Sequence, residues 1–187
     1  MADKNKVMLA VCAVAVAALA GSALAADKKP VAPRTPAINW VKSVPLDLAV
    51  QTAEVALKHC RENNRHPSVG VMDFDGVMKV LMIDDNANEV GQHALVHKMY
   101  TAVLMQTTTE VLVERSPTGV RSEIDPESDV LDKIAPGGLI SPGGYALKVN
   151  GEFVGVLGVG GTGLGMTPGA EGECADFGGK WFDAQVK

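Results

Sequence analysis

The strongest constraint on the fold is a hairpin signal near the C-terminal end of the chain. Asn150 and Gly151 separate two runs rich in apolar and β-branched residues, 145–149 and 152–159. Both turn residues accept the positive φ that a type I′ turn requires, so the pair is the strongest short-range signal for an antiparallel hairpin. Glycines recur along the second run and at its exit: Gly155, Gly158, Gly160 and Gly161. Because glycine has no side chain, another backbone or a flat ligand can approach such a strand closely.

Periodicity along the rest of the chain predicts an α+β domain. Helical spacing of apolar residues predicts helices near 45–63, 88–104 and 170–184, with a short helix ending near 114. Alternation and turn signals predict strands at 68–73, 77–83, near 139, 145–150 and 152–159. The order of these elements predicts one five-stranded, mainly antiparallel sheet flanked by helices. We expect Asp84-Asp85-Asn86 to cap the second long helix.

The first 25 residues predict a bacterial export signal. Lys4 and Lys6 precede an apolar run at 7–20, and Ala23-Leu24-Ala25 forms an A-x-A cleavage site. The apolar run is too short to span a membrane, and no other run in the sequence is long enough. The sequence therefore predicts a periplasmic or secreted protein that is not inserted in the membrane after cleavage.

The sequence predicts three segments: a signal peptide at 1–25, an extended, proline-containing leader at 26–44, and a single domain at 45–187. Cleavage removes two lysines and one aspartate, which moves the net charge from −5 to −6. A negative chain with 4% aromatic residues argues against a nucleic-acid partner and against an anionic membrane surface.

Two cysteines, Cys60 and Cys174, remain after cleavage. Exported proteins meet an oxidising compartment, where such a pair forms a disulfide if the fold brings the two residues together. Two buried free thiols are the other interpretation, and the spacing alone leaves both open.

Two histidines one helical turn apart are the clearest candidate for chemistry. His93, His97, Tyr100 and Leu104 recur with helical spacing in a stripe beside the apolar face of the second long helix. Two imidazoles in this arrangement can share a metal, or one can bind a haem iron while the other stays close by. Ordinary histidines at a helix edge or a subunit interface give the same spacing. Because no glutamate follows the first histidine, a zinc metalloprotease motif is absent.

Other residues of this helix and its surroundings carry weaker signals. We expect Lys98 to point away from the core, where it can pair with an acidic ligand group, whereas five residues are expected to face the core: Leu95, Val96, Met99, Ala102 and Val103. The run 107–109 is predicted to cap a helix, and Glu110 to lie on a solvated face. The segment 158–163 matches G-x-G-x-x-G, but too little chain follows for a dinucleotide-binding fold, which leaves a flexible or ligand-facing rim.

Several segments together resemble the GlcG/HbpS-like haem-binding family, which includes the C-terminal domain of PduO. The segments that carry the resemblance are 72–76 (MDFDG), 98–102 (KMYTA), 108–111 (TTEV), 137–140 (GGLI) and 149–161 (VNGEFVGVLGVGG). The last is similar to the family's V-x-G-x-x-V-G-A-I-G-V-S-G hairpin. The resemblance extends from about 46 to 184.

The resemblance implies a profilin-like α+β domain that forms homo-oligomers and binds a tetrapyrrole, with haem expected and a corrinoid as the alternative. Matched motif positions imply Lys98, Thr101 and Thr108 as cofactor-binding residues. His93 and His97 are this chain's own candidates for iron ligands, with Tyr100 beside them. We expect His93 or His97 on the iron and Lys98 near a propionate.

The functional prediction is an exported haem-binding protein that serves in storage, sensing or breakdown. Binding is favoured over haem degradation, which needs in addition an open iron face and a reductant. A non-haem small-molecule-binding or sensor accessory module is one alternative, and an enzyme acting on a small organic acid is another.

Overall fold

The computed structural model describes residues 43–115, 138–162 and 169–187. The predicted signal peptide lies outside the described residues, as do most of the predicted leader and most of the glycine-rich segment after residue 162. In chain order the elements are α1 (Leu46–Glu62), β1 (Ser68–Asp73), β2 (Met78–Ile83), α2 (Glu89–Met105), α3 (Thr109–Arg115), β3 (Gly144–Val149), β4 (Glu152–Gly160) and α5 (Ala170–Gln185).

The strands form a four-stranded antiparallel sheet in the order β2-β1-β4-β3. The hairpin between β3 and β4 is confirmed, because Asn150 and Gly151 both have positive φ, 52° and 83°. The expected five-stranded sheet is not confirmed. In the described part of the chain no strand forms near Leu139, where Ile140 alone makes a single bridge.

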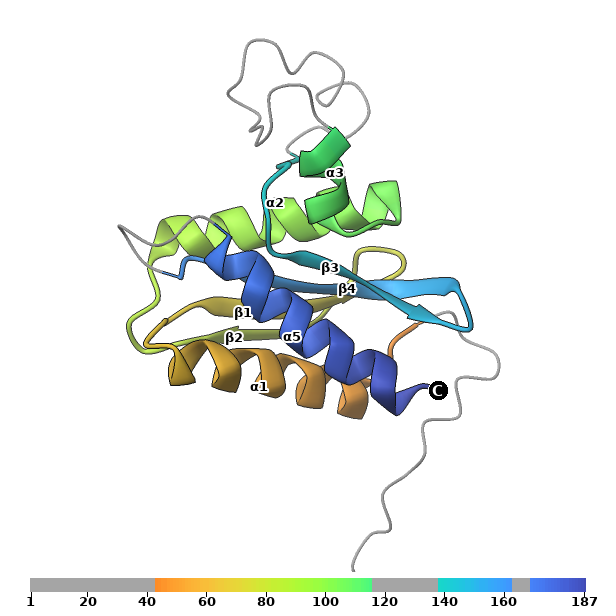
Figure 1. Cartoon of the computed structure of the whole chain (residues 1–187), viewed down its shortest axis with the longest axis horizontal. Helices are drawn as coiled ribbons and strands as arrows, with labels where there is room; N and C mark the ends of the chain where they lie inside the picture. Colours follow the sequence, from red (N-terminus) through yellow and green to blue (C-terminus); the bar gives the residue numbers. More distant parts are fainter. Residues whose placement is uncertain (1–42, 116–137, 163–168) are drawn as a thin grey trace, which may run out of the picture. The chain divides into compact units, whose positions relative to one another are not determined.

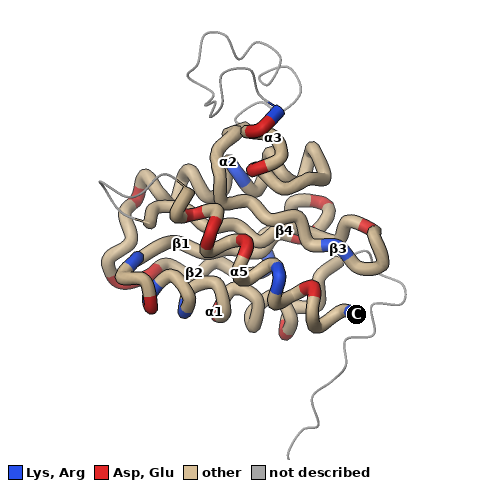
Figure 2. The backbone as a smooth tube through the Cα atoms, viewed as in Figure 1, with Lys and Arg blue, Asp and Glu red and all other residues tan. Residues whose placement is uncertain are grey.

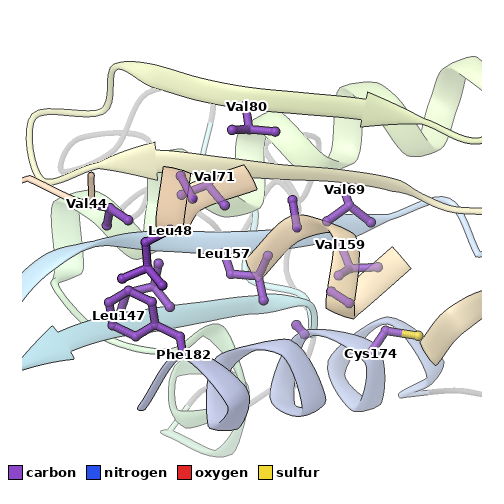
Figure 3. Packing of buried hydrophobic residues seen from close by; sticks show 14 of the residues in the cluster. Val44, Leu48, Val69, Val71, Val80, Leu147, Leu157, Val159, Cys174 and Phe182 are labelled. Atoms are coloured by element: carbon purple, nitrogen blue, oxygen red, sulfur yellow. The ribbon is translucent and has the colours of Figure 1, made fainter. Parts of the chain in front are cut away.

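Helices cover both faces of the sheet (Figure 1). α1 and α5 pack together on one face, over the larger group of buried apolar side chains shown in Figure 3. α2 packs on the other face, over a smaller apolar group that includes Leu95, Met99 and Val156. The described helices include none that is long and apolar enough to cross a bilayer.

The glycines of β4 have a packing role that the sequence left open. A Cβ on Gly158 would lie 2.3 Å from Cγ of Met99, and one on Gly160 would lie 2.3 Å from the carbonyl oxygen of Gly91. Ordinary contacts need more than 3 Å, so only glycine lets α2 lie this close to the strand. The backbone that approaches the bare strand is therefore that of α2.

The cap of α2 differs from the expectation. The Asn88 side chain accepts a hydrogen bond from the Gly91 amide at 2.6 Å and caps the helix. Asp84 lies earlier and binds Arg61 of α1 instead, with oxygen–nitrogen distances of 2.8 and 3.0 Å. This ion pair and the two hydrogen bonds hold the pKa of the buried Asp84 carboxyl well below its usual value, at about 2.

Cys60 of α1 and Cys174 of α5 form a disulfide, with their Cα atoms 5.6 Å apart. Both residues are fully buried in the apolar group between these helices and the sheet. The bond joins positions 114 residues apart, and it fixes the last helix to the first.

Removing this disulfide should lower stability strongly. A cross-link over so long a loop restricts the unfolded chain, so we expect Cys60→Ala with Cys174→Ala to lower the free energy of unfolding by about 4 kcal/mol. Denaturant titration measures the change. Reductant should shift the midpoint of the unaltered protein toward that of the double variant and leave the variant itself unchanged. An unaltered protein that does not respond to complete reduction would contradict this account.

Asp84 should give the fold a defined acid sensitivity. Its pKa is lowered from 3.8 to about 2, so its contribution is fully present above pH 4 and is lost as the pH falls toward 2. We expect Asp84→Asn to be less stable than the unaltered protein at pH 6, and to lose less stability between pH 4 and 2. Thermal melts across this range test it, with Glu54→Gln on the exposed side of α1 as the control. Parallel pH profiles for the unaltered protein and Asp84→Asn would refute the assignment.

Candidate functional site

The predicted histidine stripe lies together on the outer face of α2, away from the sheet. His93 is largely exposed, at 73% of its side chain, and its Nε2 lies 3.9 Å from a carboxylate oxygen of Glu89. His97 is half-buried one turn further along, and Tyr100 and Leu104 continue the stripe as exposed side chains. The residues that the sequence placed in one stripe therefore share one accessible surface.

This outer face is unusually apolar for a surface helix. The large apolar side chains exposed on α2 are Val90, Val96, Tyr100, Leu104 and Met105. Val96 was expected in the core and is 37% exposed instead, whereas the neighbouring Leu95 is fully buried. Figure 2 shows the tube of α2 tan along most of its length, since Glu89 and Lys98 are its only formally charged residues. A helix that is apolar on both sides is typical of one covered on both sides.

Lys98 does not point away from the core, which corrects the sequence expectation. Its side chain is 1% exposed, and its ammonium donates to the carbonyl oxygens of Pro142 at 3.0 Å and Val159 at 3.2 Å. The third partner is the carboxylate of Glu171, which belongs to α5. An ammonium has three donors, and here each has an acceptor inside the protein. Lys98 therefore has no donor left for a ligand propionate.

The carboxylate of Glu171 connects three parts of the fold. Its Oε1 accepts the Gly161 amide at 2.6 Å and the Thr162 amide at 3.4 Å, while Oε2 binds Lys98. The end of β4, the first turn of α5 and the middle of α2 are thereby held at one point. No local sequence pattern indicates this role, because the partners lie far apart along the chain.

The two predicted threonines also bind the backbone. The Thr101 hydroxyl donates to the carbonyl oxygen of His97 at 2.9 Å and accepts the Leu139 amide at 2.7 Å. The Thr108 hydroxyl accepts the Ala146 amide of β3 at 3.1 Å. Thr101 thus ties the backbone at His97 to the segment before β3, and neither hydroxyl lies in the histidine stripe.

A pocket of about 330 Å³ opens between α3 and the start of α5. Its lining residues are Thr108, Glu110, Pro142, Tyr145, Gly169, Gly172, Glu173 and Asp176. Thr108 is the only one of the predicted cofactor-binding residues in this lining. The pocket and the histidine stripe are therefore separate features of the described surface.

Glu110 is not the solvated residue that its position in the sequence suggested. Its Oε1 accepts the Gly143 amide at 3.0 Å, and burial raises the pKa of its carboxyl above the usual value. The carboxyl is half-buried at the pocket wall, since α3 packs against β3. Across the pocket, Arg65 binds Glu173 at 2.8 Å and lowers the pKa of that carboxyl.

Metal ligation by protein side chains alone is limited in this region. Nowhere in ranges 43–115, 138–162 and 169–187 do three or more His, Cys, Asp or Glu side chains gather as a metal cluster. In the described residues, the predicted metal site on α2 therefore offers two imidazole ligands, His93 and His97. They suit an ion that brings most of its own ligands.

Comparison with known proteins decides the family. A family model described as haem degrading protein, HbpS-like, matches residues 44–166, about two thirds of the chain. The chain belongs to the HbpS-like family. The match contains α2 and the β3–β4 hairpin, whereas α5 lies beyond it. No curated protein matches the chain.

Solved structures agree with this assignment. The crystal structure of HbpS is 25% identical, with a TM-score of 0.61, over 74% of this chain and 89% of that one. An HbpS double mutant from Streptomyces reticuli is 26% identical, with a TM-score of 0.62, over 82% of this chain and 96% of that one. A complex of PduOC with haem shares the fold at 20% identity and a TM-score of 0.59, over 73% of this chain and 92% of that one. The profilin-like description stays a prediction.

Replacing Lys98 by methionine should destabilise the HbpS-like domain of this chain. The change leaves the Glu171 carboxylate and two carbonyl groups without their cation, so we expect a loss of about 3 kcal/mol in the free energy of unfolding. Lys180→Met is the matched control, because Lys180 forms an exposed pair with Asp176 at 2.5 Å, and its loss should cost less than about 1 kcal/mol. Equal effects of the two substitutions in denaturant titrations would refute the structural role of Lys98.

Proposed function

We propose that this protein is an exported haem-binding protein whose binding surface is the outer face of α2. One observation carries the proposal: two imidazoles lie one turn apart on the outer face of α2, where the other large exposed side chains, apart from Glu89, are apolar. Family membership supports a haem-related role, and the fold that this chain shares with PduOC holds haem in that protein.

Haem suits this surface better than a bare metal ion does. A porphyrin supplies four nitrogen ligands to its iron, so the protein needs to add only one or two axial ligands. His93 and His97 are the proposed ligands, with either ring on the iron and the other beside it. The apolar macrocycle would cover Tyr100 and Leu104, which water otherwise surrounds. A corrinoid would meet the same surface and remains the alternative tetrapyrrole.

The remaining predicted residues take supporting roles in the proposal. Thr101 bonds the backbone of His97, so it positions that residue and does not contact the ligand. Lys98 holds α2 in place through its buried ion pair. Thr108 lies at the separate pocket, and any contact between this hydroxyl and haem would need a second binding mode.

Export to the periplasm or beyond is part of the proposal. The signal at 1–25 directs the chain out of the cytoplasm, and the disulfide between Cys60 and Cys174 supports this, because such bonds persist mainly in oxidising compartments. Binding, for storage or sensing, is favoured over breakdown, because breakdown needs an open iron face and an external reductant in addition to the iron ligand. Self-association is expected as well, as the family resemblance implies.

Hemin titration tests the proposal directly. The purified protein should shift the Soret band on adding hemin, and His93→Ala with His97→Ala should weaken binding roughly tenfold or more and remove the low-spin spectrum. His66→Ala is the matched control, because His66 is half-exposed but pairs with Asp84 at 3.2 Å, away from α2. A double variant that binds hemin with unchanged affinity and spectrum would exclude the α2 surface. Loss of the Soret band on adding ascorbate would favour haem breakdown over storage.

A further inference from the structure

The pocket between α3 and α5 has a charge pattern that the proposed haem surface on α2 does not explain. Three carboxyl groups line it, those of Glu110, Glu173 and Asp176, and its lining among the described residues contains no lysine, arginine or histidine. At about 330 Å³ the pocket has room for a small molecule. An anionic ligand would meet negative charge there without a compensating cation, so the lining argues against a small organic acid.

Two of these three carboxyl groups already have cationic partners. Arg65 binds Glu173 at 2.8 Å, and Lys180 binds Asp176 at 2.5 Å. Both acidic side chains are also about half exposed, so water solvates them. Their charges are therefore balanced without a ligand, and Glu110 is the carboxyl that distinguishes this pocket from an ordinary acidic surface.

Glu110 has neutral partners in the part of the chain that the structure describes. Its carboxyl accepts the Gly143 amide at 3.0 Å and the Thr109 hydroxyl at 3.4 Å. Lys98 does not pair with it, because the three donors of that ammonium bind Glu171 and two carbonyl oxygens. Burial raises the pKa of the Glu110 carboxyl, which means that its surroundings disfavour the ionised form. A cation in the pocket would stabilise that ionised form.

The lining combines this carboxyl with an aromatic ring. A Cβ on Gly172 would overlap Oε1 of Glu110, so a glycine in the first turn of α5 leaves the carboxyl its position. Tyr145 supplies its ring to the same lining, and its hydroxyl donates to Asp183 at 2.8 Å, which holds the ring in place. The pocket therefore offers a ligand one negative group and a fixed apolar surface.

We propose that this pocket binds a small organic cation, whose ammonium group pairs with Glu110 and whose hydrocarbon part lies against Tyr145 and Pro142. The Thr108 hydroxyl lines the same pocket and offers the ammonium a second acceptor oxygen. A bare metal ion suits the pocket less well, because the described residues contain no cluster of three or more His, Cys, Asp or Glu side chains that could hold one. This site is additional to the haem surface and does not depend on it.

Three probes with the same butyl chain test the charge preference. n-Butylamine is a cation at pH 7, 1-butanol is neutral and pentanoate is an anion. In NMR titrations of the haem-free protein, n-butylamine should give saturable shifts at the amides of Gly143 and Gly172, and it should bind more tightly than 1-butanol. Pentanoate should give no saturable shift there. Binding of 1-butanol or pentanoate as tight as that of n-butylamine, or saturation of these amides by none of the three, would overturn the proposal.

A charge-removing variant tests the role of Glu110 independently. Glu110→Gln keeps an oxygen that can accept the Gly143 amide but removes the negative charge, so the affinity for n-butylamine should fall roughly tenfold or more. Glu114→Gln, at an exposed residue one turn further along α3, is the matched control and should leave the affinity unchanged. Circular dichroism confirms that both variants are folded. Unchanged affinity in a folded Glu110→Gln variant contradicts the proposal. Because haem is absent from these titrations, their failure and the failure of haem binding are distinguishable.

Discussion

The close contact between α2 and β4 is the constraint on which the rest of this structure depends. Gly158 and Gly160 remove the side chains that would hold the helix away, and Gly91 removes the obstacle on the helix itself. With the helix this close, the ammonium of Lys98 reaches the carbonyl of Val159 and the carboxylate of Glu171. A buried ammonium requires such partners, so the glycines and the lysine depend on each other.

The position of α2 also decides which of its residues meet water. The helix uses one face for Leu95, Met99 and Ala102, and the opposite face is left with His93, His97 and Tyr100. Removing the exposed apolar side chains on that face from water would be favourable, so the face favours binding of a ligand or partner that covers it. Under the proposed function, the imidazoles among them serve as iron ligands, a use that a purely apolar partner would not make of them.

Local signals in the sequence predicted most of the secondary structure, and long-range contacts explain what they missed. The turn at Asn150 and Gly151 and the strand at 68–73 depend on neighbouring residues, and the structure has them where periodicity indicated. Lys98 can be buried because it pairs with Glu171, which is 73 positions away in the sequence. Hydrophobic periodicity along α2 contains no information about that partner. The predicted stripe on α2 formed as expected, whereas the burial of Glu110 follows from its packing against a distant strand and had no local signal.

The last helix shows how elements outside the matched family segment still shape the candidate site. α5 begins beyond residue 166, yet its Glu171 binds Lys98 of α2, which covers the opposite face of the sheet, and its Cys174 is bonded to α1 on its own face. The first attachment is a charged contact, whereas the second is a covalent bond that breaks on reduction. Because the two contacts come from successive turns of one helix, the disulfide also limits how far Glu171 can move from Lys98. The covalent bond between α1 and α5 thereby helps to keep the outer face of α2 in one position.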